Sequence, residues 1–292
     1  MSDTPRLLRT LDEMRLQRAG WHSAGLTIGL VPTMGFLHEG HRRLMELLRP
    51  QCDRLVVSVF VNPSQFGKGE DLAKYPRDLE RDTALCAGAG VDVIFHPEAE
   101  EVYPASFDTW IEPGQAVKHA CGPWRPGHFR GVLTIVWRLL NWVQPHHAIF
   151  GRKDAQQLWL IQRMVKDLEM PIQIHEGPLV READGLAMSS RNTYLDPRER
   201  QAAGEINRLL KAAAKRTIEG EPLEAIRQAT LRSLADHPLR APQYLEFIDW
   251  ESFTLRSDRP LSRRTALLTA VQVGPARLID NVFIRGDGHL EI

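Results

Sequence analysis

Cysteine, net charge and long apolar runs are all scarce in this sequence, and each scarcity excludes a class of protein. The three cysteines are far apart in 292 residues and outside any Cys-x-x-Cys pattern, so we expect a reduced, cytoplasmic protein without a disulfide framework. The 37 Lys and Arg balance 37 Asp and Glu, whereas a surface that holds long nucleic acid has a clear basic excess. No apolar run approaches the roughly 18 residues of a membrane span, and the charged N-terminus lacks the apolar core of a signal peptide. We therefore expect no nucleic acid or membrane partner, and small molecules as substrates.

One stretch has the residue types of a phosphate-binding turn. The apolar run at 26–31 predicts a buried strand, and Leu44, Leu47 and Leu48 have the spacing of a helix. Between them lies Pro-Thr-Met-Gly-Phe-Leu-His-Glu-Gly-His at 32–41. In open α/β sheets, ligands bind outside the carboxyl ends of the strands, where the next helix presents free N–H groups and the positive end of its dipole. The order of strand, glycine turn and helix therefore indicates an anion site.

Two histidines and two glycines give this turn its chemistry. His38 and His41 stand where the predicted helix begins, and there they can hydrogen-bond phosphate oxygens and stabilise charge on a pentacoordinate phosphorus. Gly35 and Gly40 remove side chains where a phosphate must approach the backbone. A capped turn with solvent-facing histidines and a zinc-binding pair are the alternatives, although the sequence supplies no further metal ligands at usable spacing. The surrounding strand and helix favour a nucleotide site, and we predict no metal site made by the protein.

Two further predicted strands end in polar side chains. The apolar run at 54–61 predicts a strand buried on both faces, and Asn62 and Gln65 follow it with neutral amides suited to hydroxyls and carboxylates. A later strand runs into Lys153 and Asp154. A lysine in this position is a point charge aimed at phosphates, whereas the aspartate can simply cap the next helix. An ordinary Asn-Pro turn is the alternative for the first of these strand ends.

Strands and helices alternate from residue 26 to about residue 179, the pattern of a parallel sheet with right-handed crossovers. We therefore predict an α/β fold whose N-terminal domain, 1–179, is a doubly wound, Rossmann-like sheet. Asp-Pro-Arg-Glu at 196–199 has the cap, proline and glutamate of a helix start, and two helices and three antiparallel strands predict a smaller α+β domain at 180–292. The expected helices are 7–19, 79–86, 132–143 and 156–166, and the remaining expected strands are 91–95, 148–150, 172–174, 244–248, 266–273 and 276–284.

The loop at 185–192 lies at the junction of the two predicted domains. It carries the hydroxyls of Ser189 and Ser190 and the guanidinium of Arg191. Such a segment suits a lid that closes over a triphosphate and excludes water. A plain polar linker is the alternative, and the loop alone does not decide between the two.

Taken together, four motifs closely resemble the pantothenate synthetase family, whose members are pantoate–beta-alanine ligases. The motifs are Pro-Thr-Met-Gly-x-Leu-His-x-Gly-His at 32–41, Phe-Val-Asn-Pro-x-Gln-Phe at 60–66, Lys-Asp-x-Gln-Gln-Leu at 153–158 and Asp-Gly-Leu-Ala-Met-Ser-Ser-Arg-Asn at 184–192. The match spans about residues 29–195 and continues weakly to Ala-Arg-Leu-Ile-Asp-Asn at 276–281. The family belongs to the nucleotidyltransferases related to class I aminoacyl-tRNA synthetases, in which 38–41 resembles the HIGH signature and 188–191 the KMSKS loop.

The resemblance implies an activity and its cofactors. It implies an ATP-dependent ligase that joins pantoate to beta-alanine through a pantoyl adenylate, releasing pyrophosphate and then AMP. It also implies a requirement for Mg²⁺ and a homodimer joined through the N-terminal domains. The C-terminal domain is expected to be the lid.

The resemblance also implies roles for individual residues. His41, His38 and Lys153 are expected to be catalytic. The expected ATP-binding residues are Met34, Gly35, His38, His41, Gly151, Lys153, Asp154, Val180, Met188, Ser189, Ser190 and Arg191. The expected pantoate-binding residues are Gln65 and Gln157, to which we add Asn62 from its place after a predicted strand.

The sequence departs from the family pattern at two positions. Arg152 stands where Glu is usual, and Ala155 replaces a common aromatic residue. We predict that Arg152 faces solvent and that Arg152→Glu stabilises the protein, because a cation opposes the dipole at the start of a helix. Two other functions stay open: another adenylyl-transferring enzyme of the same fold, and a catalytically silent binder of nucleotide or RNA, which the neutral charge disfavours.

Overall fold

The computed structural model describes residues 4–257 and 262–291, and the chain forms two compact units. The N-terminal unit consists of Met1–Pro113, Arg125–Arg152 and Leu160–Pro178, and the C-terminal unit of Gly114–Trp124, Lys153–Trp159 and Leu179–Ile292. This division differs from the predicted domains chiefly in assigning two short segments, 114–124 and 153–159, to the C-terminal unit. Residues 1–3, 258–261 and 292 of the predicted domains lie outside the described residues.

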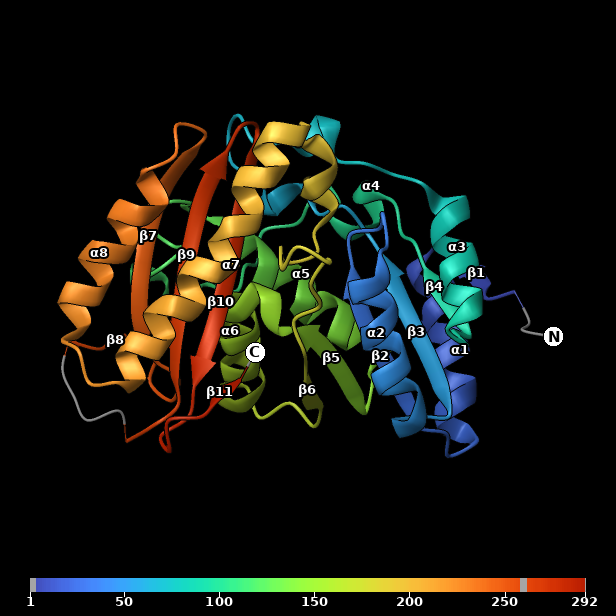
Figure 1. Cartoon of the computed structure of the whole chain (residues 1–292). Helices are drawn as coiled ribbons and strands as arrows, with labels where there is room; N and C mark the ends of the chain where they lie inside the picture. Colours follow the sequence, from blue (N-terminus) through green and yellow to red (C-terminus); the bar gives the residue numbers. More distant parts are fainter. Residues whose placement is uncertain (1–3, 258–261, 292) are drawn as a thin grey trace. The chain divides into compact units, whose positions relative to one another are not determined.

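The N-terminal unit contains a six-stranded parallel sheet, which confirms the doubly wound α/β prediction (Figure 1). The order of its strands is β1-β4-β3-β2-β5-β6. Their bounds are β1 Arg6–Leu8, β2 Ile28–Thr33, β3 Arg54–Val59, β4 Val93–Phe95, β5 His147–Gly151 and β6 Gln173–Gly177. Apart from β1 at the edge, chain order runs outward in both directions from the neighbouring pair β2 and β5. The carboxyl ends of these two strands therefore flank the switch point, where ligands bind in sheets of this kind.

Helices pack beside this sheet in two groups. Helix α2 packs with α3, and α1 packs with α5. Their bounds are α1 Leu11–Ser23, α2 Glu39–Leu48, α3 Leu79–Gly88, α4 Ala99–Val102 and α5 His128–Val143, while α6, Ala155–Asp167, begins in the C-terminal unit and ends in the N-terminal one. Apolar side chains of β2, β3 and α2, among them Val31, Val57, Met45 and Leu48, are fully buried in one cluster. This core fixes the direction in which β2 and β3 deliver the segments that follow them.

The helix expected at 7–19 is wrong at its start. Residues Arg6–Leu8 form β1, which pairs in parallel with β4, and α1 begins only at Leu11. Thr10 caps α1 in a capping box with Glu13. A strand of three residues is too short to show the alternation of apolar and polar residues that identifies a strand. Its leucines were therefore counted with the helical spacing of the residues that follow.

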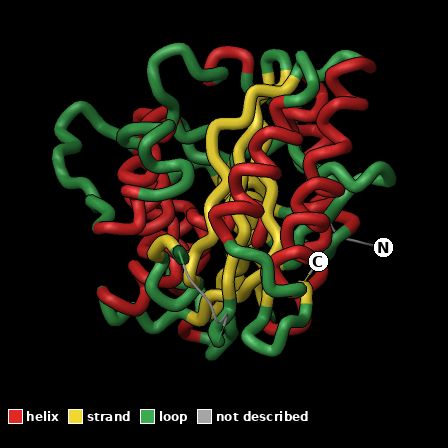
Figure 2. The backbone as a smooth tube through the Cα atoms, turned by 60° about the vertical axis from the view of Figure 1, so that its left-hand side comes forward, coloured by secondary structure: helices red, strands yellow, loops and turns green. Residues whose placement is uncertain are grey.

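The C-terminal unit is an antiparallel sheet with two helices, as predicted. The strand order is β11-β10-β9-β7-β8, and α7 and α8 cover one face of the sheet (Figures 1 and 2). The bounds are α7 Pro197–Ile218, α8 Leu223–Ala235, β7 Arg240–Asp249, β8 Thr254–Leu255, β9 Thr265–Val273, β10 Ala276–Ile284 and β11 Leu290–Glu291. Helix α7 has the predicted start, with Asp196 as its cap and Glu199 completing a capping box.

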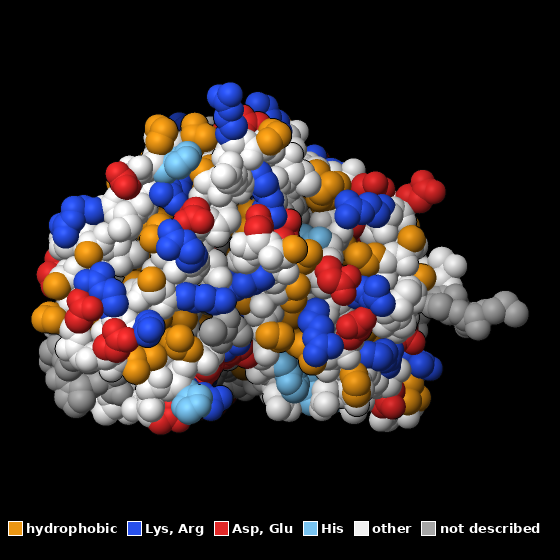
Figure 3. Space-filling view, viewed as in Figure 1, with side chains coloured by type: hydrophobic (Ala, Val, Ile, Leu, Met, Phe, Trp, Pro, Cys, Tyr) orange, Lys and Arg blue, Asp and Glu red, His pale blue; other side chains and the backbone are white. Residues whose placement is uncertain are grey.

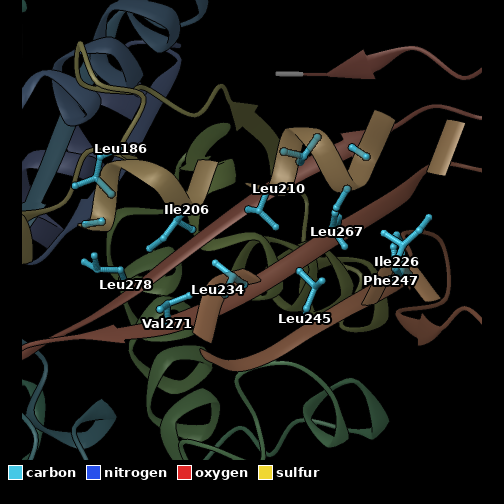
Figure 4. Close-up of a cluster of buried hydrophobic side chains, with 14 of the residues drawn as sticks. Leu186, Ile206, Leu210, Ile226, Leu234, Leu245, Phe247, Leu267, Val271 and Leu278 are labelled. Carbon is cyan, nitrogen blue, oxygen red and sulfur yellow. The ribbon is translucent and has the colours of Figure 1, made fainter. Parts of the chain in front are cut away.

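The core of the C-terminal unit lies between these helices and the sheet. Ile206 and Leu210 of α7 and Ile226 and Leu234 of α8 meet strand residues such as Leu267 (Figure 4). Leu186, which comes from the loop before α7, belongs to the same cluster (Figure 4). The loop that carries the predicted lid residues is therefore anchored in this core at one point.

Short 3-10 turns connect several of these elements. They are η1 Arg49–Gln51, η2 Pro63–Gln65, η3 Leu72–Lys74, η4 Gln115–Lys118, η5 Arg152–Asp154 and η6 Ser190–Tyr194. Among the described helices, none combines the length and apolar character needed to cross a membrane. On the face drawn in Figure 3, the basic and acidic side chains of the described residues are interspersed.

Candidate functional site

The turn predicted to bind phosphate starts α2 with its own two histidines. His38 is the N-cap of α2 and has an extended backbone, with φ −138° and ψ 178°. Its Nδ1 accepts a hydrogen bond from the N–H of Gly40 at 3.1 Å, and Nδ1 of His41 accepts one from the N–H of His38 at 3.2 Å. The two ring centroids are 4.1 Å apart. The turn is therefore capped, and the histidine side chains are themselves the capping groups.

These bonds decide which ring nitrogen carries the proton when the imidazoles are neutral. Because a backbone N–H is a donor, each Nδ1 must be unprotonated, and the proton of the neutral ring lies on Nε2. His38 and His41 therefore hold Nε2–H donors beside the N–H groups of the first turn of α2. Such a concentration of donors at a helix N-terminus suits an anion such as a phosphate group.

A buried aspartate holds the strained part of the same turn. Asp82 of α3 is 1% exposed, and its carboxylate accepts the N–H of Phe36 at 2.8 Å and of Leu37 at 2.6 Å. Gly35 and Phe36 have φ of 81° and 50°, and a Cβ at Gly35 would stand 3.0 Å from Asp82 Oδ2. Burial raises the pKa of the Asp82 carboxyl, and the N–H bonds from Leu37 and Phe36 oppose that shift. Asp82 thus holds Phe36 in a backbone conformation that non-glycine residues seldom adopt.

The two amides that follow β3 differ in their surroundings. Asn62 is 1% exposed, and its Nδ2 donates to Oε1 of Gln65 at 3.0 Å and to the carbonyl of Gly131 at 3.2 Å. Its Oδ1 accepts the hydroxyl proton of Tyr103 at 2.9 Å. Gln65 in turn donates from Nε2 to Sδ of Met34 at 3.1 Å. The structure therefore brings Met34 and Gln65 together, and both amide hydrogens of Asn62 are donated to protein acceptors.

Arg152 contradicts the prediction that it faces solvent. Its side chain is 12% exposed, and its Nε lies 3.4 Å from Oε1 of Glu176. Glu176 is on β6, the parallel neighbour of β5, opposite Phe150. The prediction considered only the helix that follows Arg152 in the sequence and not the strand beside it. An ion pair that is largely shielded from water replaces the expected helix-dipole effect as the main influence on this residue.

We expect Arg152→Glu to lower the free energy of unfolding by about 1 to 3 kcal/mol, because it puts two carboxylates where a partly buried ion pair now lies. This sign is the reverse of the one expected from the helix dipole. Urea unfolding measures the change, and the charge-swapped double variant Arg152→Glu with Glu176→Arg should recover about half of it. A single variant as stable as the unmodified protein would contradict the pairing.

Lys153, Asp154 and Gln157 lie together at the start of α6, in the C-terminal unit. Lys153 Nζ is 3.5 Å from Oδ2 of Asp154, and the carbonyl of Lys153 accepts from Nδ2 of Asn281 at 3.0 Å. Gln156 is 4% exposed, and its side-chain amide donates to the backbone carbonyls of Ala116 and His119. Its neighbour Gln157 is only half-buried. Of the two adjacent glutamines, Gln156 thus has a structural role, whereas the side chain of Gln157 stays partly exposed.

The segment that carries Met188, Ser189, Ser190 and Arg191 is an ordered turn. A short hairpin comes before it, in which Met188 N–H donates to the carbonyl of Val180 at 3.0 Å. Ser189 then caps η6, where its hydroxyl accepts the N–H of Arg191 at 3.3 Å. Ser190 is 8% exposed. The three residues that the sequence assigned to the triphosphate therefore belong to one small folded element.

The predicted site residues divide between the two units. Those in the N-terminal unit are Met34, Gly35, His38, His41, Asn62, Gln65 and Gly151, and those in the C-terminal unit are Lys153, Asp154, Gln157, Val180, Met188, Ser189, Ser190 and Arg191. Within the described part of the chain, no three or more His, Cys, Asp or Glu side chains form a group that could hold a metal ion. Sequence reasoning missed Asp82, for which the only signal was an acidic residue inside a predicted helix.

Similarity to known proteins extends over nearly the whole chain. The family model described as pantoate-beta-alanine ligase matches residues 6–283. Pantothenate synthetase 1 of Bradyrhizobium diazoefficiens is 50% identical over 283 residues, covering 96% of this chain and 98% of the relative. The pantothenate synthetase of Heliobacterium modesticaldum is 48% identical over 281 residues, covering 96% and 99%.

Solved structures give the same result. The crystal structure of pantothenate synthetase from Thermus thermophilus matches with a TM-score of 0.87 and 43% identity, covering 94% of this chain and 98% of that one. A pantoate-beta-alanine ligase from Francisella tularensis, complexed with beta-gamma ATP and beta-alanine, matches with a TM-score of 0.78 and 30% identity, covering 98% and 99%. With a family model matched from β1 to β10 and relatives this similar over their full length, the chain belongs to the pantoate-beta-alanine ligase family.

Proposed function

We propose that this protein condenses pantoate with beta-alanine in an ATP-dependent reaction that yields pantothenate, AMP and pyrophosphate, through a pantoyl adenylate. Membership of the family supports the overall reaction. The observation that carries the proposal within the structure is the pair His38 and His41, whose Nδ1 atoms are occupied by backbone N–H groups so that Nε2–H donors stand at the start of α2. This turn follows β2, one of the two strands at the switch point of the sheet.

In the first step, the carboxylate of pantoate attacks the α-phosphorus of ATP. A bond forms between a carboxylate oxygen and the α-phosphorus as the bond from the α-phosphorus to the oxygen bridging to the β-phosphorus breaks, and pyrophosphate leaves. A carboxylate is already ionised at pH 7, so the step needs alignment and charge neutralisation more than it needs a base. His38, His41 and Lys153 supply donors for the developing charge. Ser189, Ser190 and Arg191 act on the β- and γ-phosphates of the same nucleotide.

The remaining assignments concern the nucleoside and pantoate. Met34, Gly35, Gly151, Asp154, Val180 and Met188 contact ATP. Gln65 and Gln157 hold pantoate, and Asn62 acts through Gln65, because its amide hydrogens are donated to Gln65 and Gly131. In this proposal the hydrogen bond from Nε2 of Gln65 to Sδ of Met34 links a residue that contacts pantoate to one that contacts ATP.

In the second step, the amine of beta-alanine attacks the acyl carbon of the adenylate. The C–N bond forms, the bond from the acyl carbon to the AMP oxygen breaks, and AMP leaves. The ammonium group of beta-alanine must lose protons before and during this attack, and these pass to solvent or to the departing phosphate. Exclusion of water from the adenylate is then the main task of the protein, which we assign to closure of the C-terminal lid.

Mg²⁺, assembly and location complete the proposal. The described residues offer no group of three or more His, Cys, Asp or Glu for a metal, so Mg²⁺ is expected to arrive with ATP, held by phosphate oxygens and water, rather than in a protein cage. The protein is expected to act in the cytoplasm as a homodimer joined through the N-terminal unit. The three cysteines are free, consistent with a reducing compartment.

Exchange of labelled pyrophosphate into ATP tests this proposal. We expect exchange with pantoate and without beta-alanine, because the adenylate forms before the amine arrives. Exchange that strictly required beta-alanine would rule out this order of steps. Exchange that needed no pantoate would favour another adenylyl-transferring enzyme, and nucleotide binding without any exchange would favour a silent binder.

A further inference from the structure

Two adjacent residues of β10, Asp280 and Asn281, are buried polar residues in a strand that is otherwise mainly apolar. Asp280 is 3% exposed and Asn281 is 4% exposed. Neighbouring residues of a strand point to opposite faces of the sheet, so this pair serves two different parts of the C-terminal unit. Buried polar groups are costly unless they are hydrogen-bonded, and both side chains have specific partners.

Asp280 holds the base of the loop that carries the proposed phosphate contacts. Its Oδ2 and Oδ1 accept hydrogen bonds from Nη1 and Nη2 of Arg181 at 2.8 and 2.9 Å, which makes a bidentate ion pair. Arg181 also donates to the carbonyl of Gly185 at 3.1 Å, and it pairs with Ala187 in an isolated β-bridge. The hairpin from Val180 to Met188 is therefore tied to β10 immediately before Ser189.

Asn281 holds the backbone of the proposed catalytic lysine. Its Nδ2 donates to the carbonyl of Lys153 at 3.0 Å, and its own N–H donates to Oδ1 of Asp280 at 2.6 Å. Arg181 Nη2 also donates to the carbonyl of Asn281 at 3.3 Å. Two adjacent residues of β10 thus connect Lys153 to the hairpin, although Lys153 and Arg181 are 28 positions apart in the sequence.

We propose that Asp280 and Asn281 are positioning residues, which fix Lys153 relative to the loop Met188–Arg191 so that both reach the triphosphate in the geometry of adenylate formation. This inference rests on the proposed function, because it assigns these two groups to the same nucleotide. Neither Asp280 nor Asn281 needs to touch a substrate. Their effect is confined to the step in which pyrophosphate leaves, since the second step no longer involves the β- and γ-phosphates.

The test separates the two half-reactions in an Asn281→Leu variant, which keeps a similar volume and removes the donor to Lys153. We expect pantoate-dependent pyrophosphate exchange to fall by about 10- to 30-fold, because displacing a catalytic group by about 1 Å is enough for such a loss. Aminolysis of chemically prepared pantoyl adenylate by beta-alanine should stay within about twofold of the unmodified protein. A residue that merely supports the fold would slow both half-reactions.

A matched control comes from the same strand. Ile284 of β10 is fully buried, and Ile284→Val removes one methyl group at a cost in stability without touching Lys153 or Arg181. It should leave both half-reactions unchanged. Equal losses of the two half-reactions in Asn281→Leu, or no loss in either, would overturn the positioning role. An unmodified protein that shows no pantoate-dependent exchange would instead overturn the proposed function.

Asp280→Asn tests the ion pair between Asp280 and Arg181 at the base of the hairpin. It leaves the buried guanidinium of Arg181 without its counter-charge, so this variant is also expected to lose stability. If it folds, exchange should fall more than aminolysis, as in Asn281→Leu. Equal falls in both half-reactions would remove Asp280 from the proposal, and the Asn281→Leu result stands independently.

Discussion

His41→Asn will slow adenylate formation by at least about 100-fold, equivalent to about 2.7 kcal/mol of transition-state stabilisation, while leaving the fold intact. The asparagine Oδ1 lies where Nδ1 of the histidine lay, so it can still accept the N–H of His38 and keep the cap of α2. What it lacks is the Nε2–H donor. The loss of rate therefore measures the phosphate contact and not the cap.

His41→Gln is the reciprocal variant. The amide nitrogen of the glutamine reaches about as far as Nε2 of the histidine ring. The glutamine side chain, however, has no acceptor atom in the position of Nδ1. It should therefore keep more of the activity and lose more of the stability than His41→Asn does. Single-turnover formation of the adenylate and a thermal melt distinguish the two variants. A near-normal single-turnover rate in His41→Asn would remove His41 from the catalytic set.

The parts of the fold that the sequence predicted are those that depend on short stretches. Apolar runs located β2, β3 and β5, and a local pattern of Asp196, Pro197 and Glu199 located the start of α7. These signals lie within a few residues of the feature that they specify. The alternation of strands and helices up to about residue 179 was then enough to predict the parallel sheet, and three strands that follow two helices predicted the antiparallel one.

The misses depend on partners that are distant in the sequence. Arg152 was assigned to solvent because Glu176 is brought beside it only by the pairing of β5 with β6. In the same way, no pattern in the sequence shows that Trp159 donates to the carbonyl of Trp250, or that the carbonyl of Lys153 accepts from Asn281. A periodic pattern reports which face of an element is apolar, but not which polar group from another element will meet it.

Among the candidate site residues, sequence and structure contribute different information. The order of strand, glycine turn and helix selected His38 and His41, and family resemblance implied their catalytic role, but only the hydrogen bonds assign the proton of each neutral ring to Nε2. Family resemblance also selected Gln157. The structure explains why its neighbour Gln156 is not available to a substrate, since the side-chain amide of Gln156 is hydrogen-bonded to backbone groups. The chemical roles of these side chains remain proposals, which the kinetic experiments above decide.

Asp82→Asn will lower the free energy of unfolding by about 2 to 3 kcal/mol, because one of two backbone donors loses its acceptor in a buried place. The carboxylate now accepts Phe36 N–H on one oxygen and Leu37 N–H on the other. An amide has a single oxygen, so one of these N–H groups must face an NH₂ group. The change keeps the shape of the side chain and alters only its hydrogen bonding.

The same substitution should also slow adenylate formation by about tenfold or more, because the turn that Asp82 holds leads directly into His38. Phe36 has a φ of 50°, a conformation that persists only while the surroundings enforce it. Asp78→Asn is the matched control, since Asp78 caps the same helix through the N–H of Arg81 at 3.1 Å. Asparagine caps a helix as well as aspartate does, so this control should change neither stability nor rate. If both variants behaved alike in urea unfolding and single-turnover kinetics, Asp82 would be an ordinary helix residue, and the geometry of the histidine turn would have to be held by β2 and α2 alone.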